Sequence, residues 1–283
     1  MLFHLRIKPL TIAVMASFGA IGQLHAADTA LPQVNVQDQT ERADGPVTGY
    51  RATRSSTFTK TDTPLKEVPA SISVIPEALI KDQAMSGMAD ALRYVPGAHG
   101  AQGEGNRDQV MLRGINTTAD FFVDGVRDDM QIFRDFYNLE RLEVLKGPGG
   151  MAFGRGGAGG VINRVVKKPQ FGHVGEASIS LGSYSRLRGS VDLGNKANDT
   201  TAWRLNAMAE NGNSFRNGFD MKRYAVNPTV TILVSPATTL TLGFEHARDE
   251  RTADRGIPSA AATLAPFETD RSTFFGNADQ SEA

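Results

Sequence analysis

Cysteine is absent from this chain of 283 residues, which excludes a disulfide-bonded scaffold, a cysteine-ligated metal site and thiol catalysis. Only five histidines occur, and no two of them have the helical spacing of a zinc hydrolase motif. The chain also lacks a run of about 18 apolar residues, the length that a membrane-spanning helix needs. Its 30 Lys and Arg residues are balanced by 31 Asp and Glu residues, so the basic surplus typical of a nucleic-acid-binding protein is missing.

The N-terminus has the layout of a secretory signal peptide over residues 1–26. Two basic residues precede a short apolar core at 10–21, and the small residues Ala26 and Ala27 follow it. The alternative, a buried first helix, leaves the order of charge, apolar run and small residues unexplained. We therefore expect the mature chain to be exported from the cytoplasm.

Residues 27–64 are predicted to form a flexible arm. Most of this segment is rich in Thr, Ser, Arg, Asp and Gly, and it has few large apolar residues with which to bury a core. Near its start, Val34 and Val36 alternate with polar residues in a strand pattern with a proline at its edge. Such a strand either adds to the sheet edge of another protein or forms an edge strand of the next domain. The residues alone leave both alternatives open.

Residues 65–168 are predicted to form a compact α+β domain. A strand is expected at 71–75, and Pro76 is placed to open a helix at its first turn. A second helix is expected at 85–94, and the apolar residues on its buried face are Met85, Met88, Ala89 and Leu92. Further short strands are expected at 110–112, 121–126, 142–145 and 161–166, with a tight turn at Asp124-Gly125.

Eight of the 14 residues at 147–160 are glycine, and they include a GxGxxG pattern at 154–159. A dinucleotide-binding fold needs a helix directly after this pattern, so that the helix N-terminus faces the pyrophosphate. Here the β-branched run 161–166 follows instead, and we reject nucleotide binding. We expect the glycines to provide positive φ angles and close backbone approach in a packed turn.

Five runs between residues 174 and 248 alternate apolar and polar residues, and they lie at 175–181, 187–193, 203–210, 224–234 and 240–245. Short links at 195–200 and 235–238 alternate with a longer link at 211–222 and a polar tail after Arg248. This pattern is typical of an outer-membrane barrel. A soluble antiparallel sandwich with one wet face has the same periodicity, but the signal peptide and the unequal links favour the barrel.

Taken in order, seven segments resemble the plug domain of TonB-dependent outer-membrane siderophore receptors. They are 68–75 (VPASISVI), 92–97 (LRYVPG), 111–115 (MLRGI), 122–127 (FVDGVR), 139–148 (LERLEVLKGP), 153–156 (FGRG) and 159–163 (GGVIN). The resemblance implies an α+β plug domain at 65–168, followed at 169–283 by about five antiparallel strands of an incomplete transmembrane β-barrel. The 127–138 stretch is most similar to receptors for catecholate-type siderophores.

The resemblance also implies roles for individual residues. The strand-like segment is similar to the TonB box, which pairs with TonB of the TonB–ExbB–ExbD system; its residues are Leu31, Pro32, Gln33, Val34, Asn35 and Val36. Arg113 and Lys146 match basic plug positions that pair with barrel glutamates, and those partners would lie in later strands. The residues expected to bind the ferric siderophore at the outward plug loops are Gln102, Arg107, Arg127, Gln131, Phe133, Arg134 and Tyr137. Arginine binds oxygen anions in bidentate fashion, and aromatic rings pack on catechols.

The function implied is gated, TonB-dependent uptake of a ferric siderophore across the bacterial outer membrane, by a chain expected to be truncated after the early barrel. The expected partners are TonB, the chelate and outer-membrane lipid, without nucleic acid. Iron would arrive inside its chelate, so neither a cofactor nor a protein metal site is expected, and no catalytic constellation suggests an enzyme. The alternative is a soluble periplasmic plug-like module, or a non-functional fragment, that binds TonB or chelate without transport.

Overall fold

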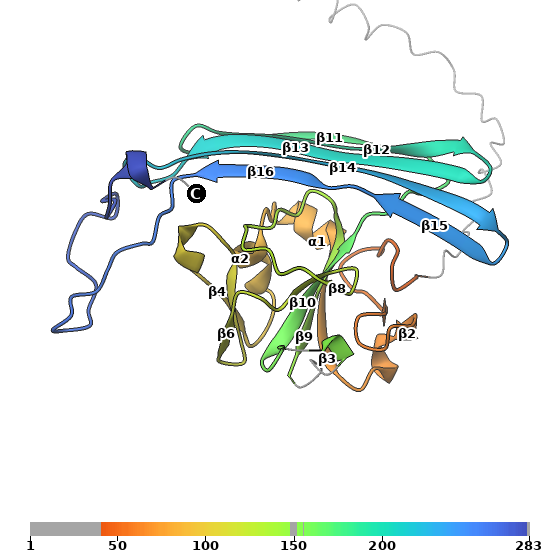
Figure 1. Cartoon of the computed structure of the whole chain (residues 1–283), viewed down its shortest axis with the longest axis horizontal. Coiled ribbons are helices and arrows are strands. Elements are labelled where there is room, and N and C mark those ends of the chain that lie inside the picture. Colours follow the sequence, from red (N-terminus) through yellow and green to blue (C-terminus); the bar gives the residue numbers. More distant parts are fainter. Residues whose placement is uncertain (1–40, 148–151, 155, 282–283) are drawn as a thin grey trace, which may run out of the picture. The chain divides into compact units, whose positions relative to one another are not determined.

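The computed structural model describes residues 41–147, 152–154 and 156–281. The chain divides into two units, Met1–Gln39 and Thr40–Ala283. The predicted signal peptide (1–26) and TonB box (31–36) both lie outside the described residues. The second unit contains a plug region and a long antiparallel sheet (Figure 1).

A five-stranded sheet forms the centre of the plug region, in the order β3-β9-β10-β7-β8. Its strands are β3 (Ser71–Pro76), β7 (Phe121–Val123), β8 (Val126–Arg127), β9 (Leu139–Lys146) and β10 (Gly160–Val166). Strands β10 and β7 are parallel, whereas the other pairs are antiparallel. The predicted 121–126 strand is a hairpin, because Asp124 and Gly125 adopt positive φ angles of 48° and 81° and turn the chain between β7 and β8.

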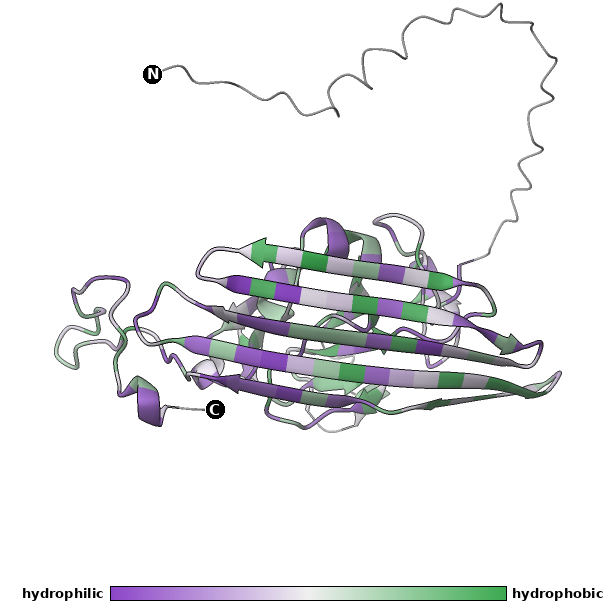
Figure 2. Cartoon of the chain, turned by 90° about the horizontal axis from the view of Figure 1, so that it is seen from above, coloured by the Kyte–Doolittle hydropathy of each residue, from purple (hydrophilic) through white to green (hydrophobic). Residues whose placement is uncertain are grey.

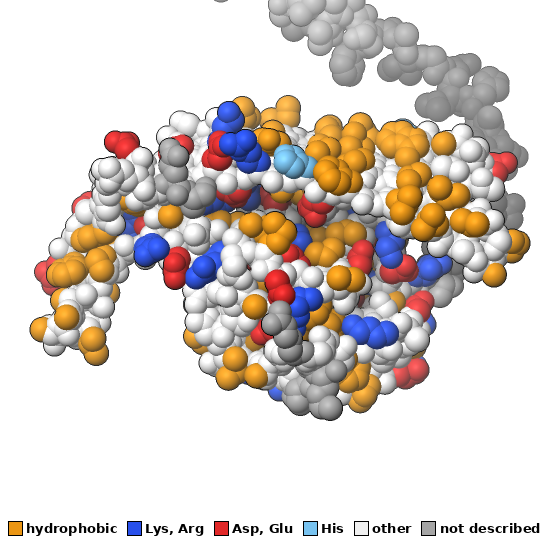
Figure 3. Space-filling view, viewed as in Figure 1, with side chains coloured by type: hydrophobic (Ala, Val, Ile, Leu, Met, Phe, Trp, Pro, Cys, Tyr) orange, Lys and Arg blue, Asp and Glu red, His pale blue; other side chains and the backbone are white. Residues whose placement is uncertain are grey.

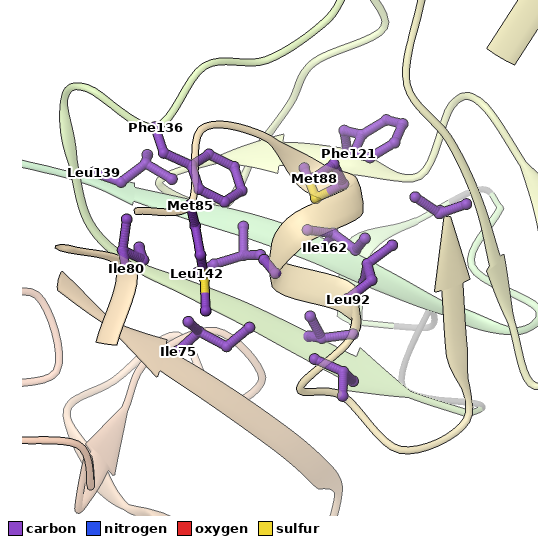
Figure 4. Close-up of a cluster of buried hydrophobic side chains, with 14 of the residues drawn as sticks. Ile75, Ile80, Met85, Met88, Leu92, Phe121, Phe136, Leu139, Leu142 and Ile162 are labelled. Carbon is purple, nitrogen blue, oxygen red and sulfur yellow. The ribbon is translucent and has the colours of Figure 1, made fainter. Parts of the chain in front are cut away.

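Two short helices, α1 (Glu77–Asp82) and α2 (Met88–Leu92), contribute to the main core of the plug. Figure 4 shows side chains from both helices facing apolar side chains of the sheet. The second helix is shorter than the predicted 85–94, and it buries Ala91 rather than Ala89, which is exposed. Gly87 precedes α2 in an extended conformation without a side-chain cap, so the helix begins three residues later than its apolar spacing suggested.

A three-stranded sheet lies beside this core, and its strands are β4 (Ala98–Ala101), β5 (Gln109–Leu112) and β6 (Ile115–Thr117). The glycine-rich run then leads into strand β10 rather than a helix, as expected for a packed turn. A Cβ atom at Gly160, whose φ is 139°, would overlap the carbonyl oxygen of Leu145. One at Gly159 would overlap that of Leu112. The glycines therefore allow close backbone approach.

The prediction of a flexible arm as far as residue 64 is wrong from Glu41 onward. Residues 41–64 contain the pair β1 (Arg54–Ser55) and β2 (Thr63–Pro64), and they pack on the plug. The contact is polar: the hydroxyls of Ser55 and Thr57 both donate to the buried carboxylate of Glu143. Composition concealed this contact, because a segment poor in large apolar residues can still be ordered when its hydroxyls satisfy a buried charge.

Six strands form the long sheet: β11 (Val174–Gly182), β12 (Arg186–Asn198), β13 (Thr201–Asn213), β14 (Asp220–Ser235), β15 (Thr238–Gly243) and β16 (His246–Arg251). Five strands were predicted; the charged sequence of β16 concealed the sixth. Strands β15 and β16 both pair with β14 in one continuous register. Pro228 of β14 separates them, because it lacks an N–H for the ladder. The Asn227 side chain donates to the Phe244 carbonyl instead, at 2.8 Å.

The two faces of this sheet differ as predicted. On β14, the face with Ala225, Asn227 and Thr231 is buried toward the plug, while Tyr224 and Val234 on the other face are exposed. Figure 2 shows the resulting alternation of polar and apolar residues along the strands. Within the described residues, no helix is long and apolar enough to cross a membrane.

The links between strands are unequal at the two ends of the sheet. The links at 199–200 and 236–237 lie at one end, here called the short-link end. The links at 183–185 and 214–219 and the segment 252–281 after β16 lie at the other, the long-link end. This arrangement matches the predicted alternation and is the one found in outer-membrane barrels.

Candidate functional site

A cleft of about 830 Å³ lies between the plug loop at 128–137 and strands β13, β14 and β16. Four of the predicted siderophore-binding residues line it, and these are Arg127, Phe133, Arg134 and Tyr137. A smaller adjoining cleft of about 170 Å³ is lined by Gln131 and Phe133. The structure therefore brings together five of the seven predicted residues around one loop.

Arg127 and Gln131 are anchored to the backbone beside this loop. The Arg127 guanidinium donates to the Ala119 carbonyl at 2.7 Å and lies 4.8 Å from the centre of the Phe122 ring. The Gln131 amide donates to the Thr118 carbonyl at 2.9 Å. Arg127 also lies 3.5 Å from Asp129 and 3.9 Å from Asp120, so both side chains are held in place beside the loop.

Arg134 is buried and holds the loop together. Its guanidinium donates to the Asp128 carboxylate at 2.8 Å and to the carbonyls of Met130 and Ile132 at 2.6 and 3.1 Å. It also lies 4.0 Å from the centre of the Phe121 ring. Its side chain is 0% exposed, and its hydrogen bonds hold the loop in shape. Its predicted contact with a siderophore remains a prediction.

Asp108 ties this loop to the neighbouring plug loop. Its carboxylate accepts the Arg134 backbone N–H at 2.9 Å, and its own N–H donates to Ile132. Burial raises the pKa of Asp108 to about 6, although the charge of Arg134 acts in the opposite direction. A buried carboxyl group with a raised pKa therefore lies behind the loop.

Phe133 contacts the edge strand β16, and Tyr137 contacts the residue directly before it. The guanidinium of Arg251 lies 4.0 Å over the Phe133 ring. The Tyr137 hydroxyl donates to Glu245 at 3.1 Å, and Asn138 donates to the same carboxylate oxygen at 3.2 Å. Burial and the charge of Glu245 raise the pKa of Tyr137, so its phenol stays protonated and acts as a donor.

Gln102 and Arg107 lie away from the cleft, at the long-link end of the sheet. The Gln102 amide donates to the Asp254 carbonyl in the 252–281 segment. Arg107 pairs with Glu104 at 3.1 Å, and Glu104 also pairs with Arg255 at 3.3 Å. The plug loop that carries these two residues is therefore covered by the segment after β16.

Arg113 and Lys146 lie close to the same turn of the plug. The Arg113 backbone N–H donates to Gly97 at 2.9 Å, and the Lys146 ammonium is 3.4 Å from the Pro96 carbonyl. Within the described part of the chain, neither side chain forms an ion pair. Their predicted pairing with barrel glutamates remains a prediction.

A buried charge cluster joins the plug to the sheet, and the sequence analysis did not identify it. It consists of Asp135 of the plug loop with Arg188, Glu210 and Arg223 of the sheet. The Arg188 guanidinium donates two hydrogen bonds of 2.7 Å to the Asp135 carboxylate, and it donates a third to Glu210, also at 2.7 Å. Arg223 approaches the same two carboxylates at 3.1 and 2.6 Å. The signal available in the sequence was the presence of charged residues on the otherwise polar faces of these strands, such as Arg188 on β12, Glu210 on β13 and Arg223 on β14.

A second group of charges joins the plug to strands β11 and β12. Glu77, Glu176 and Asp192 place carboxylate oxygens within 4.8 Å of one another, a spacing compatible with a metal ion. Lys167, however, pairs with Glu77 at 2.6 Å and with Asp192 at 2.8 Å, and Lys81 pairs with Glu77 at 2.8 Å. The lysines balance the carboxylates, so the group acts as an ion-pair network between plug and sheet.

Comparisons with known proteins agree with this architecture. The profile of the TonB-dependent Receptor Plug Domain family matches residues 64–161. The probable TonB-dependent receptor BfrD of Bordetella pertussis is 34% identical over 92% of this chain and 35% of its own length. The catecholate siderophore receptor Fiu of Escherichia coli is 34% identical over 87% of this chain and 32% of its own length.

The crystal structure of the siderophore receptor PiuA from Acinetobacter baumannii has a TM-score of 0.74 and 27% identity to this chain, covering 85% of this chain and 35% of PiuA. The chain thus spans about a third of the length of the curated relatives it matches. Both the plug region and the long sheet lie within the part of the chain that matches BfrD. The chain is therefore similar to TonB-dependent receptors over about a third of their length, and residues 64–161 match the plug domain of that family.

Proposed function

We propose that this chain acts in the TonB-dependent uptake of a ferric siderophore across the bacterial outer membrane. The observation that carries the proposal is a plug bound through buried charges to a sheet whose opposite face is apolar and exposed. Ile179, Leu181, Val234 and Phe244 are between 61% and 82% exposed on the sheet. Soluble proteins rarely expose an apolar surface of this extent, whereas lipid covers it in an outer-membrane barrel.

The cleft supports a siderophore as the ligand. It combines the cation Arg127 with the rings of Phe133 and Tyr137, a set of groups that suits an anionic chelate with flat aromatic arms. Fiu, a relative at 34% identity, is named a catecholate siderophore receptor. We therefore propose Arg127, Gln131, Phe133 and Tyr137 as the contacts of the chelate in the cleft, with Gln102 and Arg107 contributing when the 252–281 segment moves.

Transport needs a force, which we propose comes from TonB acting on residues 31–36. The first described contacts downstream of that segment are those of Glu41, which lies 3.6 Å from the buried guanidinium of Arg141 and accepts the Thr53 N–H at 2.9 Å. Tension on the arm would reach the plug sheet through these contacts, since Arg141 lies on β9. The energy would come from TonB, and Arg113 and Lys146 would hold the plug to later barrel strands until that moment.

The test is uptake of radioactive iron by cells that express the full gene product under iron limitation. We expect uptake of a ferric catecholate that disappears in an otherwise identical strain without TonB and is lost when residues 31–36 are deleted. Equal uptake with and without TonB would contradict the proposal. A product recovered in the periplasm, rather than with the outer membrane, would instead support the soluble plug-like module.

A further inference from the structure

The cleft beside the plug loop at 128–137 contains one carboxylate that no arginine balances, and this is Glu245. Figure 3 shows acidic and basic side chains along the boundary between the long sheet and the plug region. Each of the other carboxylates that line the cleft forms an ion pair with an arginine, and these are Asp128, Asp129, Asp135 and Asp249. Among the residues that the structure describes, Glu245 forms no ion pair. The cleft therefore carries an uncompensated negative charge at this one position.

The plug fixes the position of this carboxylate. Glu245 lies between β15 and β16, opposite Asn227 in the continued register of β14, and so on the plug-facing side of the sheet. The Tyr137 hydroxyl and the Asn138 amide both donate to its Oε1. Within the described part of the chain, nothing donates to its second oxygen, Oε2. A neutral carbonyl oxygen can also accept two hydrogen bonds, so the contacts with the plug do not by themselves require a charged residue here.

The surface beside Glu245 is apolar. Tyr137 packs with Met208 and Ala225 in a small buried group, and all three residues line the same cleft. An aliphatic chain that ends in a charged group lies well on such a surface, because its methylene groups cover the apolar side chains while its charged end reaches a polar partner. An ammonium group is the natural partner here, since it donates strong hydrogen bonds to a carboxylate oxygen.

We propose that Glu245 selects ferric siderophores that carry a free ammonium group on an aliphatic arm. The ammonium would bind Oε2 of Glu245, and the arm would lie against Met208 and Ala225. The iron-chelating head would stay at Arg127 and Phe133. This inference rests on the proposed function and adds to it the chemical class of the ligand. A chelate without a cation would meet an uncompensated carboxylate at the same place, so the site would also act against such a ligand.

The test is a binding titration of the full gene product with two ferric catecholate chelates that differ at one group. One chelate carries an aminoalkyl arm, and in the other the same amine is acetylated and therefore neutral. We expect the wild type to bind the ammonium chelate about tenfold more tightly, the size of one hydrogen bond between charged partners. Glu245→Gln should bind both chelates alike, because glutamine can still accept the two hydrogen bonds from the plug but lacks the charge. Glu250→Gln, on the opposite face of the same edge strand, is the matched control and should keep the preference of the wild type.

Equal affinity of the wild type for the two chelates would overturn the inference, as would a preference that survives in Glu245→Gln. Uptake of radioactive iron separates this failure from that of the proposed function. A protein that imports both chelates with the help of TonB, yet binds them equally well, contradicts the ammonium site alone. A protein that binds neither chelate, in cells whose iron uptake is the same without TonB, contradicts the proposed function as well.

Discussion

The interior of the plug and its boundary with the long sheet are built from opposite chemistry. The plug interior is apolar, and its main core includes Ile75, Leu92, Leu142 and Ile162. The boundary is dominated by buried charge, with Asp135 and Glu210 facing arginines of the sheet. A small apolar group, centred on Met208, is also present there.

The contrast separates two tasks. Apolar packing stabilises a domain without strong directional requirements, so the plug can stay folded through its own interior. Buried ion pairs add little net stability compared with apolar contacts, but leaving one partner unpaired is costly. The boundary therefore fixes one position of the plug, and water can replace its contacts if the plug moves. An apolar boundary would instead have resisted such movement.

The largest effect is expected at the charge cluster. Asp135→Ala leaves Arg188 and Arg223 without their plug partner, and we expect a loss of about 4 kcal/mol in the free energy of unfolding, measured by urea titration. Replacing Asp135 and Arg188 together by Leu should be less damaging than Asp135→Leu alone, because both charges are then removed. A double variant at least as unstable as the single one would show that the cluster does not act as paired charge.

In the plug interior, a substitution should lower the free energy of unfolding because side-chain volume is lost, not because a charge is lost. Leu142 is 0% exposed, and Leu142→Ala is expected to cost about 3 kcal/mol of unfolding free energy. Leu264→Ala is the matched control, since Leu264 is 79% exposed and its truncation should change stability by less than about 0.5 kcal/mol. Similar losses in both variants would contradict the assignment of the core.

Asp108 allows a test by pH. Burial raises its pKa from 3.8 to about 6, so the folded state binds this proton more tightly than the unfolded state. Stability from this group is therefore present at low pH and is lost as the pH rises from about 4 to about 6, by up to about 3 kcal/mol. Asp108→Asn should remove this part of the pH dependence. Parallel stability curves for wild type and variant between pH 4 and pH 7 would exclude the shift.

The smallest effect is expected where the Tyr137 side of the cleft contacts Glu245, the residue directly before β16. Tyr137→Phe removes the hydroxyl that donates to Glu245, but Asn138 still donates to that carboxylate. We expect a loss of about 1 kcal/mol in unfolding free energy. Hydrogen exchange at 244–246 should speed up only slightly. A loss as large as that of Asp135→Ala would mean that the Tyr137 contact and the charge cluster of Asp135, whose carboxylate accepts the Tyr137 N–H, are not independent.

The repeating elements were predictable from the sequence, because their signals are local. Alternation located β11 to β15, and the β-branched run after the glycines correctly predicted a strand instead of a nucleotide-binding helix. Strand β16 was missed because its HARDER sequence has no apolar face. The short α2 was overestimated because apolar spacing continued through Gly87, where the backbone is extended.

Contacts between distant segments were less predictable. The loop residues around Phe133 were predicted to be siderophore contacts through family resemblance, but the sequence could not indicate that Arg134 would be enclosed by its own loop. The cluster of Asp135 with Arg188 and Arg223 joins residues more than 50 positions apart, and nothing local marks such a pair. The ordering of 41–64 was missed because it depends on a buried Glu143 that only the folded sheet provides.

The most direct test of the account is a crosslink across the plug boundary. The chain has no cysteine, so Asn138→Cys and Asn227→Cys would be its sole thiols, at two side chains that lie 3.4 Å apart. A short reagent with two thiol-reactive methanethiosulfonate groups should join them in outer membranes, forming a disulfide to each cysteine and releasing sulfinate. We expect the joined receptor to bind its ferric chelate normally but to lose uptake, with reversal when the crosslink is cleaved. Uptake at the normal rate with the crosslink in place would contradict a plug that must leave this boundary for transport.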